Sequence, residues 1–240
     1  MLKYEERFYR LFCKSKFSME IIYKESDLFL SLDKPIEEEM VKGLVKKYYE
    51  EIAQYIKINP HFFSSLSPIE IDEDAPLIVK DMIKASLKAG VGPFSSVAGA
   101  ISWYVGKELL KICSEVIIEN GGDLFLKINE DKRIGLYLGE KFSPSFITIK
   151  LRKRETPFGV ASSSSCIGHS LNFGNTDLVT VIATDSILAD SFATSFSNRI
   201  KKEKDIEKII KEVKKLHFIE GIIVAFKNKL FLWGEVILDV

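Results

Sequence analysis

The order of strand-like and helix-like segments restricts the fold of this sequence more than any other feature. Two strand candidates fill residues 17–32, and only the three residues Lys24–Ser26 separate them, which predicts a hairpin. A helix is expected after Pro35, where acidic residues begin a run of apolar side chains at helical spacing. Residues 59–76 contain three prolines and are expected to form a connecting loop.

The remaining segments continue this alternation. Helices are expected over 36–57, 77–89, 94–112, 186–199 and 203–217, and strands over 115–119, 123–128, 133–139, 146–151, 178–183, 221–226 and 230–238, the last two turning at Asn228. In chain order this gives a strand pair, helices and a strand pair, twice over. The sequence therefore predicts an α+β protein of tandem β2α2β2 units, with a largely antiparallel sheet because the strand pairs have short turns.

Composition excludes several classes of protein. The 34 basic and 34 acidic side chains balance, so we expect no nucleic-acid partner and no anionic membrane surface. No apolar run is long enough to cross a membrane, and the first residues lack the apolar core of a signal peptide. Three cysteines without a Cys-x-x-Cys pair favour neither disulfides nor zinc. We expect one globular domain over residues 1–240, located in the cytoplasm.

Charged residues are absent from two stretches rich in glycine and serine, 89–106 and 156–176, if His169 is neutral. One interpretation is a closely packed helix and a buried serine-rich loop. The other is two walls of one ligand cleft, where backbone amides and hydroxyls recognise the ligand. In the cleft, Gly92 and Ser95 would lie at a helix start whose free amides favour a phosphate.

A glycine turn separates two of the predicted strands. Its residues are Asn120, Gly121, Gly122 and Asp123. The turn is either an ordinary connection or a place where a ligand lies against the main chain, because glycines leave room for close approach. Both interpretations stay open from the sequence.

The second uncharged stretch holds the most reactive groups of the chain. Ser162, Ser163 and Ser164 precede Cys166 and His169. A nucleophilic Ser–His or Cys–His pair is one hypothesis, and a hydroxyl-rich ligand loop is the other. The Gly-x-Ser-x-Gly pattern of a nucleophile elbow does not occur, and His169 can equally be a hydrogen-bonded structural residue.

Asp190, Thr194 and Asn198 recur at intervals of four on the predicted helix 186–199. Four residues turn an α-helix by about 400°, so the three side chains share one face. A carboxylate and a hydroxyl at this spacing can hold a hard cation such as Mg²⁺, with phosphate oxygens completing its shell. The alternative is a solvated polar face.

Four segments in series resemble one family of short, uncharacterised proteins in the ApbE-like superfamily, whose best-known members are FAD:protein FMN transferases. The segments are GVGPFSSVAGAI, EVIIENGGDLFL, GVASSSSCIGHSLNFG and LVTVIATDSILADSFATSFSNR. The resemblance runs from about residue 5 to residue 238 and implies a T-fold-like, ApbE-like α+β domain. This implied fold agrees with the predicted order of elements.

The resemblance also implies roles for particular residues. The transferases hold Mg²⁺ through an aspartate and a threonine that correspond to Asp190 and Thr194 here. Their Gly-Gly-Asp turn lies at the flavin nucleotide, which implies that role for the turn ending at Asp123. Ala161–Ser164 resembles their Ala-Thr-Ser-Gly segment. The sequence departs from them in having no lysine between 91 and 106 and no Asp-Pro pair after His169.

These observations leave three hypotheses of function. The first is an enzyme that binds FAD, FMN or another nucleotide with Mg²⁺ and acts in phosphoryl or nucleotidyl transfer, or in hydrolysis. The second is a non-flavin protein of sulfur or cofactor metabolism on the same scaffold, with Cys166 as its thiol. The third is a ligand-binding module without catalysis. A homo-oligomer is expected because exposed edge strands of such a sheet can pair.

Overall fold

The computed structural model describes residues 15–140, 142–164 and 173–239. The strands are β1 (Phe17–Tyr23), β2 (Ser26–Leu32), β3 (Val116–Asn120), β4 (Asp123–Lys127), β5 (Lys132–Tyr137), β6 (Phe146–Leu151), β7 (Phe158–Ser163), β8 (Leu178–Ala183), β9 (Ile219–Phe226), β10 (Lys229–Gly234) and β11 (Ile237–Asp239). The helices are α1 (Glu38–Ile58), α2 (Pro60–Ser64), α3 (Leu77–Ala89), the 3₁₀ turn η2 (Pro93–Ser96), α4 (Val97–Leu109), α5 (Ser186–Arg199) and α6 (Glu203–Val213).

Eight of the described strands form one sheet in the order β1-β2-β3-β4-β7-β8-β9-β10, and every neighbouring pair is antiparallel. The first four strands and the last four each contain two strand pairs separated by helices. The pairing of β4 with β7, which sets Leu124 opposite Val160, joins the two halves. The predicted α+β class with tandem β2α2β2 units and an antiparallel sheet is therefore confirmed.

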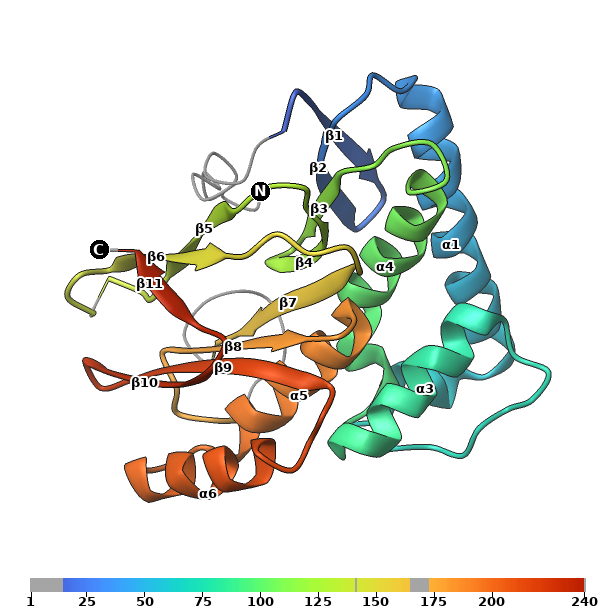
Figure 1. The fold of residues 1–240 in the computed structure, drawn as a ribbon. Helices are drawn as coiled ribbons and strands as arrows, with labels where there is room; N and C mark the ends of the chain where they lie inside the picture. Colours follow the sequence, from blue (N-terminus) through green and yellow to red (C-terminus); the bar gives the residue numbers. More distant parts are fainter. Residues whose placement is uncertain (1–14, 141, 165–172, 240) are drawn as a thin grey trace.

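The sheet is the middle layer of three (Figure 1). Side chains alternate across it, so that Ile118 and Phe125 pack with the helices, whereas their neighbours Ile117 and Leu126 pack on the opposite face. That opposite face is covered by a small sheet in the order β11-β6-β5. Two hydrophobic cores result, one on each face of the main sheet.

Three segments differ from the sequence prediction. Strand β7 occupies part of the expected serine-rich loop, because pairing with β4 on one side and β8 on the other outweighs the weak strand preference of its glycine and serines. The expected loop 59–76 contains the short helix α2. The last predicted strand divides at Gly234 (φ 86°), so that β11 joins the small sheet instead of β10's sheet.

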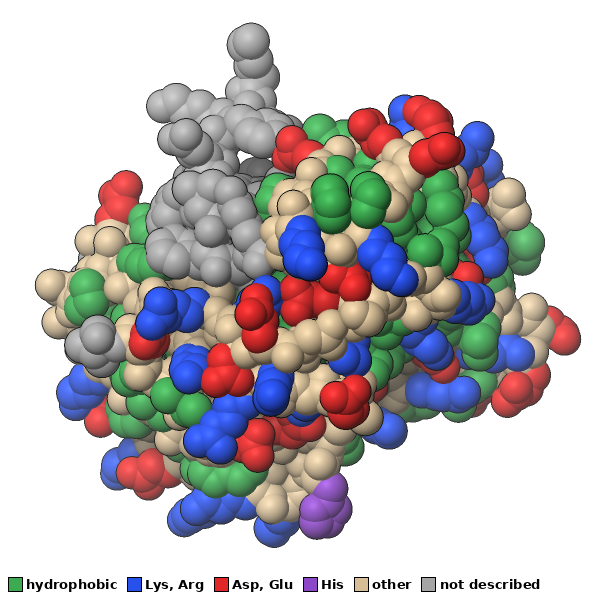
Figure 2. Space-filling model, turned by 45° about the horizontal axis from the view of Figure 1, so that its top comes forward, with side chains coloured by type: hydrophobic (Ala, Val, Ile, Leu, Met, Phe, Trp, Pro, Cys, Tyr) green, Lys and Arg blue, Asp and Glu red, His purple; other side chains and the backbone are tan. Residues whose placement is uncertain are grey.

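Figure 2 shows acidic and basic side chains interspersed over the face that it presents. Within the described ranges, no helix combines the length and the apolar character that a membrane crossing needs.

Candidate functional site

Two buried carboxyl groups from distant parts of the sequence meet on the helix-covered face of the sheet. Asp123 is the first residue of β4, and Asp190 lies in the second turn of α5. Their carboxyl groups interact directly with each other, and both residues are buried: Asp123 is 6% exposed and Asp190 is 8% exposed. The backbone N–H of Gly99 in α4 donates to Asp190 Oδ2 at 3.0 Å, and that of Ser162 in β7 donates to Asp123 Oδ1 at 3.3 Å. Four elements therefore converge on this carboxyl pair.

Burial dominates the electrostatics of the carboxyl pair. It raises the pKa of Asp190 to about 7, although the Gly99 N–H acts in the opposite direction. Burial and the nearby charge of Asp190 raise the pKa of Asp123 well above its ordinary value. A hydrogen bond between two carboxyls needs a proton, and two adjacent buried carboxylates repel each other strongly. The pair therefore requires either a shared proton or a cation.

The glycine turn places Asp123 at the carboxyl pair. Gly121 and Gly122 have φ values of 66° and 102°, which residues with a Cβ adopt rarely. Glu119 Oε1 accepts the N–H of Gly122 at 2.8 Å, and Asn120 Nδ2 donates to the carbonyl of Ala98 at 3.2 Å. The turn is thus tied to the first residues of α4, beside the carboxyl pair.

Helix α5 begins at a side-chain cap and carries Asp190 inward. Asp185 accepts the N–H of Leu188 at 2.7 Å, which satisfies one free donor of the first turn. Thr194 follows Asp190 by one turn and is half-buried. Asn198, one turn further, accepts the N–H of Phe173 at 2.9 Å. The helix face shared by Asp190, Thr194 and Asn198 is therefore present, as the sequence predicts. Its polar groups have different partners: Asp190 contacts Asp123 and Gly99, whereas Asn198 binds the backbone of Phe173.

The serines of β7 do not all face the carboxyl pair. Ser162 follows the alternation of Val160, so its side chain lies on the opposite face of the sheet, where its Oγ is 2.9 Å from Thr180 Oγ1. Only its backbone N–H reaches Asp123. Ser163 points to the helix-covered face and is half-buried, and Ser164 Oγ donates to the carbonyl of Asp177 at 2.6 Å. Cys166 and His169 lie outside the described residues.

Gly92 and Ser95 lie in a tightly packed connection. A Cβ on Gly92 would fall 2.8 Å from the carbonyl carbon of Ser65 and still closer to its oxygen, so close packing explains this glycine. Ser95 Oγ is buried without a hydrogen-bond partner among the described residues. In α4 it is the N–H of Gly99 that contacts an acidic group, because it donates to the carboxyl of Asp190.

Sequence reasoning missed Gly99 as a site residue and did not pair Asp123 with Asp190. A signal for the pairing of Asp190 was present. Asp190 is the one charged residue between Asp185 and Arg199, on a helix whose other side chains in that stretch, apart from Asn198, are apolar or hydroxyl-bearing. A single acid in such surroundings indicates a buried group with a specific partner. Its partner could not be read from the sequence.

The oxygen donors suit a hard cation. Asp123, Asp190 and Thr194 supply carboxyl and hydroxyl oxygens, the ligand type that Mg²⁺ prefers. Among the described residues no group of three His, Cys, Asp or Glu side chains could hold a metal ion. A cation at the carboxyl pair would therefore need further oxygens, which a phosphate-bearing ligand can supply.

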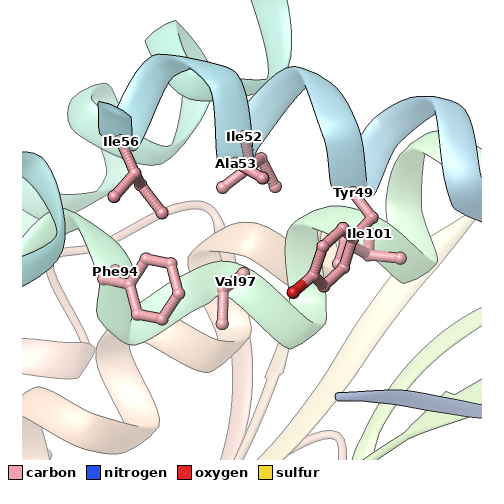
Figure 3. A pocket seen from close by; sticks show the side chains of 7 residues that line it. All are labelled: Tyr49, Ile52, Ala53, Ile56, Phe94, Val97 and Ile101. Atoms are coloured by element: carbon pink, nitrogen blue, oxygen red, sulfur yellow. The ribbon is translucent and has the colours of Figure 1, made fainter. Parts of the chain in front are cut away.

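A separate apolar pocket lies between α1 and the start of α4 (Figure 3). It has a volume of about 60 Å³ and is lined by Tyr49, Ile52, Ala53, Ile56, Phe94, Val97 and Ile101. Its one side-chain oxygen, that of Tyr49, is hydrogen-bonded to Glu25. The pocket thus offers hydrophobic contact and no group that would recognise a phosphate.

Comparison with known proteins places the chain in a family. A family model described as "AbpE bacteria" matches residues 10–215. The UPF0280 protein MJ1526 of Methanocaldococcus jannaschii is 35% identical over 225 residues, which cover 92% of this chain and 91% of the relative. The chain belongs to the UPF0280 family. A UPF0280 protein of Methanococcus vannielii is 38% identical over 220 residues and covers 88% of each chain.

Solved structures of ApbE proteins share the fold. The flavinyl transferase ApbE of Pseudomonas stutzeri superposes with a TM-score of 0.60 at 13% identity, covering 93% of this chain and 96% of its own. The flavin transferase ApbE of Vibrio cholerae gives a TM-score of 0.55 at 10% identity, with 91% and 96% covered. This UPF0280 protein is therefore ApbE-like in fold.

Proposed function

We propose that this protein binds a flavin nucleotide, FAD or FMN, through a Mg²⁺ ion held at the carboxyl pair, and that it acts in transfer or hydrolysis at the phosphate. The observation that carries the proposal is the buried contact between Asp123 and Asp190. Thr194, one turn beyond Asp190, is the third proposed oxygen donor.

Charge explains why the proposed ligand requires the metal. Two carboxyl groups repel a phosphate that approaches without a counter-ion, whereas a divalent cation between them and the phosphate attracts both. When bound, Mg²⁺ neutralises phosphate oxygens and polarises the bond to be broken. The chain's own contribution is orientation, because the N–H groups of Gly99 and Ser162 hold the two carboxyls in place.

The glycine turn is the proposed contact surface for the rest of the ligand. Gly121 is exposed and Gly122 half-buried, and no heavy atom lies within 4 Å of where a Cβ on either would stand. The main chain there leaves room for a ligand placed against Asp123. The flavin itself is proposed because solved proteins of the same fold are named flavin transferases.

A titration with FAD tests the proposal. Flavin fluorescence is followed with and without Mg²⁺ for the wild type, for Asp190→Ala, and for the matched control Asp74→Ala at an exposed position. We expect binding in the wild type and in the control only when Mg²⁺ is present, and no Mg²⁺-dependent binding in Asp190→Ala. Absence of binding by the folded wild type under both conditions would refute the flavin site, and unchanged binding by Asp190→Ala would refute the metal role.

A further inference from the structure

The first turn of α5 is held between α4 and β7 by unusually close backbone contacts. Ser186 Oγ donates to the carbonyl of Gly99 at 2.7 Å, while the N–H of Gly99 donates to Asp190 Oδ2 at 3.0 Å. One residue of α4 therefore makes two hydrogen bonds to α5, one with each of its backbone polar groups. Ser186 itself is fully buried.

Two glycines permit this approach. A Cβ on Gly99 would lie 2.9 Å from Asp190 Cβ and closer still to the carbonyl oxygen of Ser186. A Cβ on Gly159 of β7 would lie 2.5 Å from the carbonyl carbon of Asp185 and closer still to the Ser186 backbone. Neither glycine has a positive φ, so proximity and not backbone conformation requires glycine at both positions.

The same two elements hold the two carboxyls. Strand β7 carries the Ser162 N–H that contacts Asp123, and α4 carries the Gly99 N–H that contacts Asp190. Added methyl groups at the glycines would push α5 away from β7 or α4, because the atoms that they meet belong mostly to the backbone and cannot rotate away. A displacement of about 1 Å is enough to break hydrogen bonds of this length.

We propose that Gly99 and Gly159 are positioning residues, which set the distance of α5 from β7 and α4 so that Asp190 meets Asp123. The consequence for cation binding rests on the proposed function of the carboxyl pair. The positioning role itself concerns only geometry, so the two can fail separately.

The test compares Gly159→Ala with two controls. Gly43→Ala adds a methyl group in α1 where no heavy atom lies within 4 Å, and Ile209→Val removes one from the buried face of α6. One readout is the NMR signal of the Gly99 amide proton, recorded in EDTA so that no metal is bound. Its downfield chemical shift and its slow exchange with solvent report the hydrogen bond to Asp190. The second readout is Mg²⁺ affinity, measured by calorimetry with the metal alone.

We expect Gly159→Ala to lose the downfield, slowly exchanging Gly99 signal and to bind Mg²⁺ at least tenfold more weakly, while both controls stay within twofold of the wild type. If Gly159→Ala does not fold, Ser186→Ala serves instead, since it adds no atom and removes only the bond to Gly99. We expect it to show the same losses to a smaller degree.

The outcomes separate the two proposals. A wild-type Gly99 signal in Gly159→Ala, or in Ser186→Ala where that variant replaces it, overturns the positioning role. If the wild type shows the Gly99 signal but binds no Mg²⁺, the proposed cation site is refuted. The positioning role is still supported in that case when Gly159→Ala loses the Gly99 signal. Equal weakening of Mg²⁺ binding by Ile209→Val would also overturn the proposal, because general loss of stability would then explain the effect.

Discussion

Replacing Asp190 by asparagine measures what the buried carboxyl pair costs the folded protein. Asparagine has nearly the shape of a protonated aspartate, and its amide oxygen can still accept the Gly99 N–H. The substitution therefore removes ionisation while leaving the packing in place. We expect its effect on the free energy of unfolding to depend strongly on pH.

The magnitude follows from the pKa. In the folded protein the pKa of Asp190 rises from 3.8 to about 7, so the folded state binds its proton more tightly than the unfolded state does. Each pKa unit corresponds to about 1.4 kcal/mol, which gives roughly 4 kcal/mol for the full rise. The folded state holds the extra proton between pH 4 and 7, so the wild type loses stability as pH increases through that range, and the loss is complete above pH 7.

Chemical denaturation in EDTA at pH 5 and pH 8 provides the assay. We expect Asp190→Asn to gain about 3 kcal/mol relative to the wild type between these two pH values, because only the two pH units from 5 to 7 of the titration fall within the measured range. Mg²⁺ at pH 8 should then stabilise the wild type but not the variant, since ligand binding to the folded state adds stability. Parallel pH profiles for the two proteins would refute the reasoning, because they would mean that Asp190 ionises as easily in the folded protein as in the unfolded chain.

Three further experiments test other parts of the fold by denaturation. Gly122→Ala should lower the free energy of unfolding by about 1–2 kcal/mol because φ is 102° there, whereas Gly43→Ala in α1 should raise it by up to about 1 kcal/mol. Equal effects of the two substitutions would show that the positive φ of Gly122 does not require glycine. Lys132→Met should lower the free energy of unfolding by about 3–5 kcal/mol, because it leaves the buried Glu115 without the ion-pair partner that lies 3.0 Å away. The double variant that also carries Glu115→Gln should recover most of this loss, because it removes the unpaired charge. Asp185→Ala should cost about 1 kcal/mol through the lost cap of α5, and an unchanged midpoint would show that the cap is unimportant.

The sequence by itself determined most of the secondary structure. Helix α3 was predicted at its observed bounds, and the β1–β2 hairpin within one residue, because a short turn or a glycine end marks each of them locally. The tandem arrangement followed from the order of such elements. Local signals were sufficient here because the apolar spacing of each segment agrees with the face that it buries.

Only the tertiary structure decided which elements are neighbours. Strand β7 has little strand preference of its own and exists because β4 and β8 pair with it on both sides. The sequence singled out Asp123 and Asp190 separately, but 66 residues with no periodic relation lie between them. Their contact depends on the long-range packing of α5 against α4 and β7, which no local pattern encodes. Likewise, the alternation of a strand that was not predicted turned the Ser162 side chain away from the carboxyl pair.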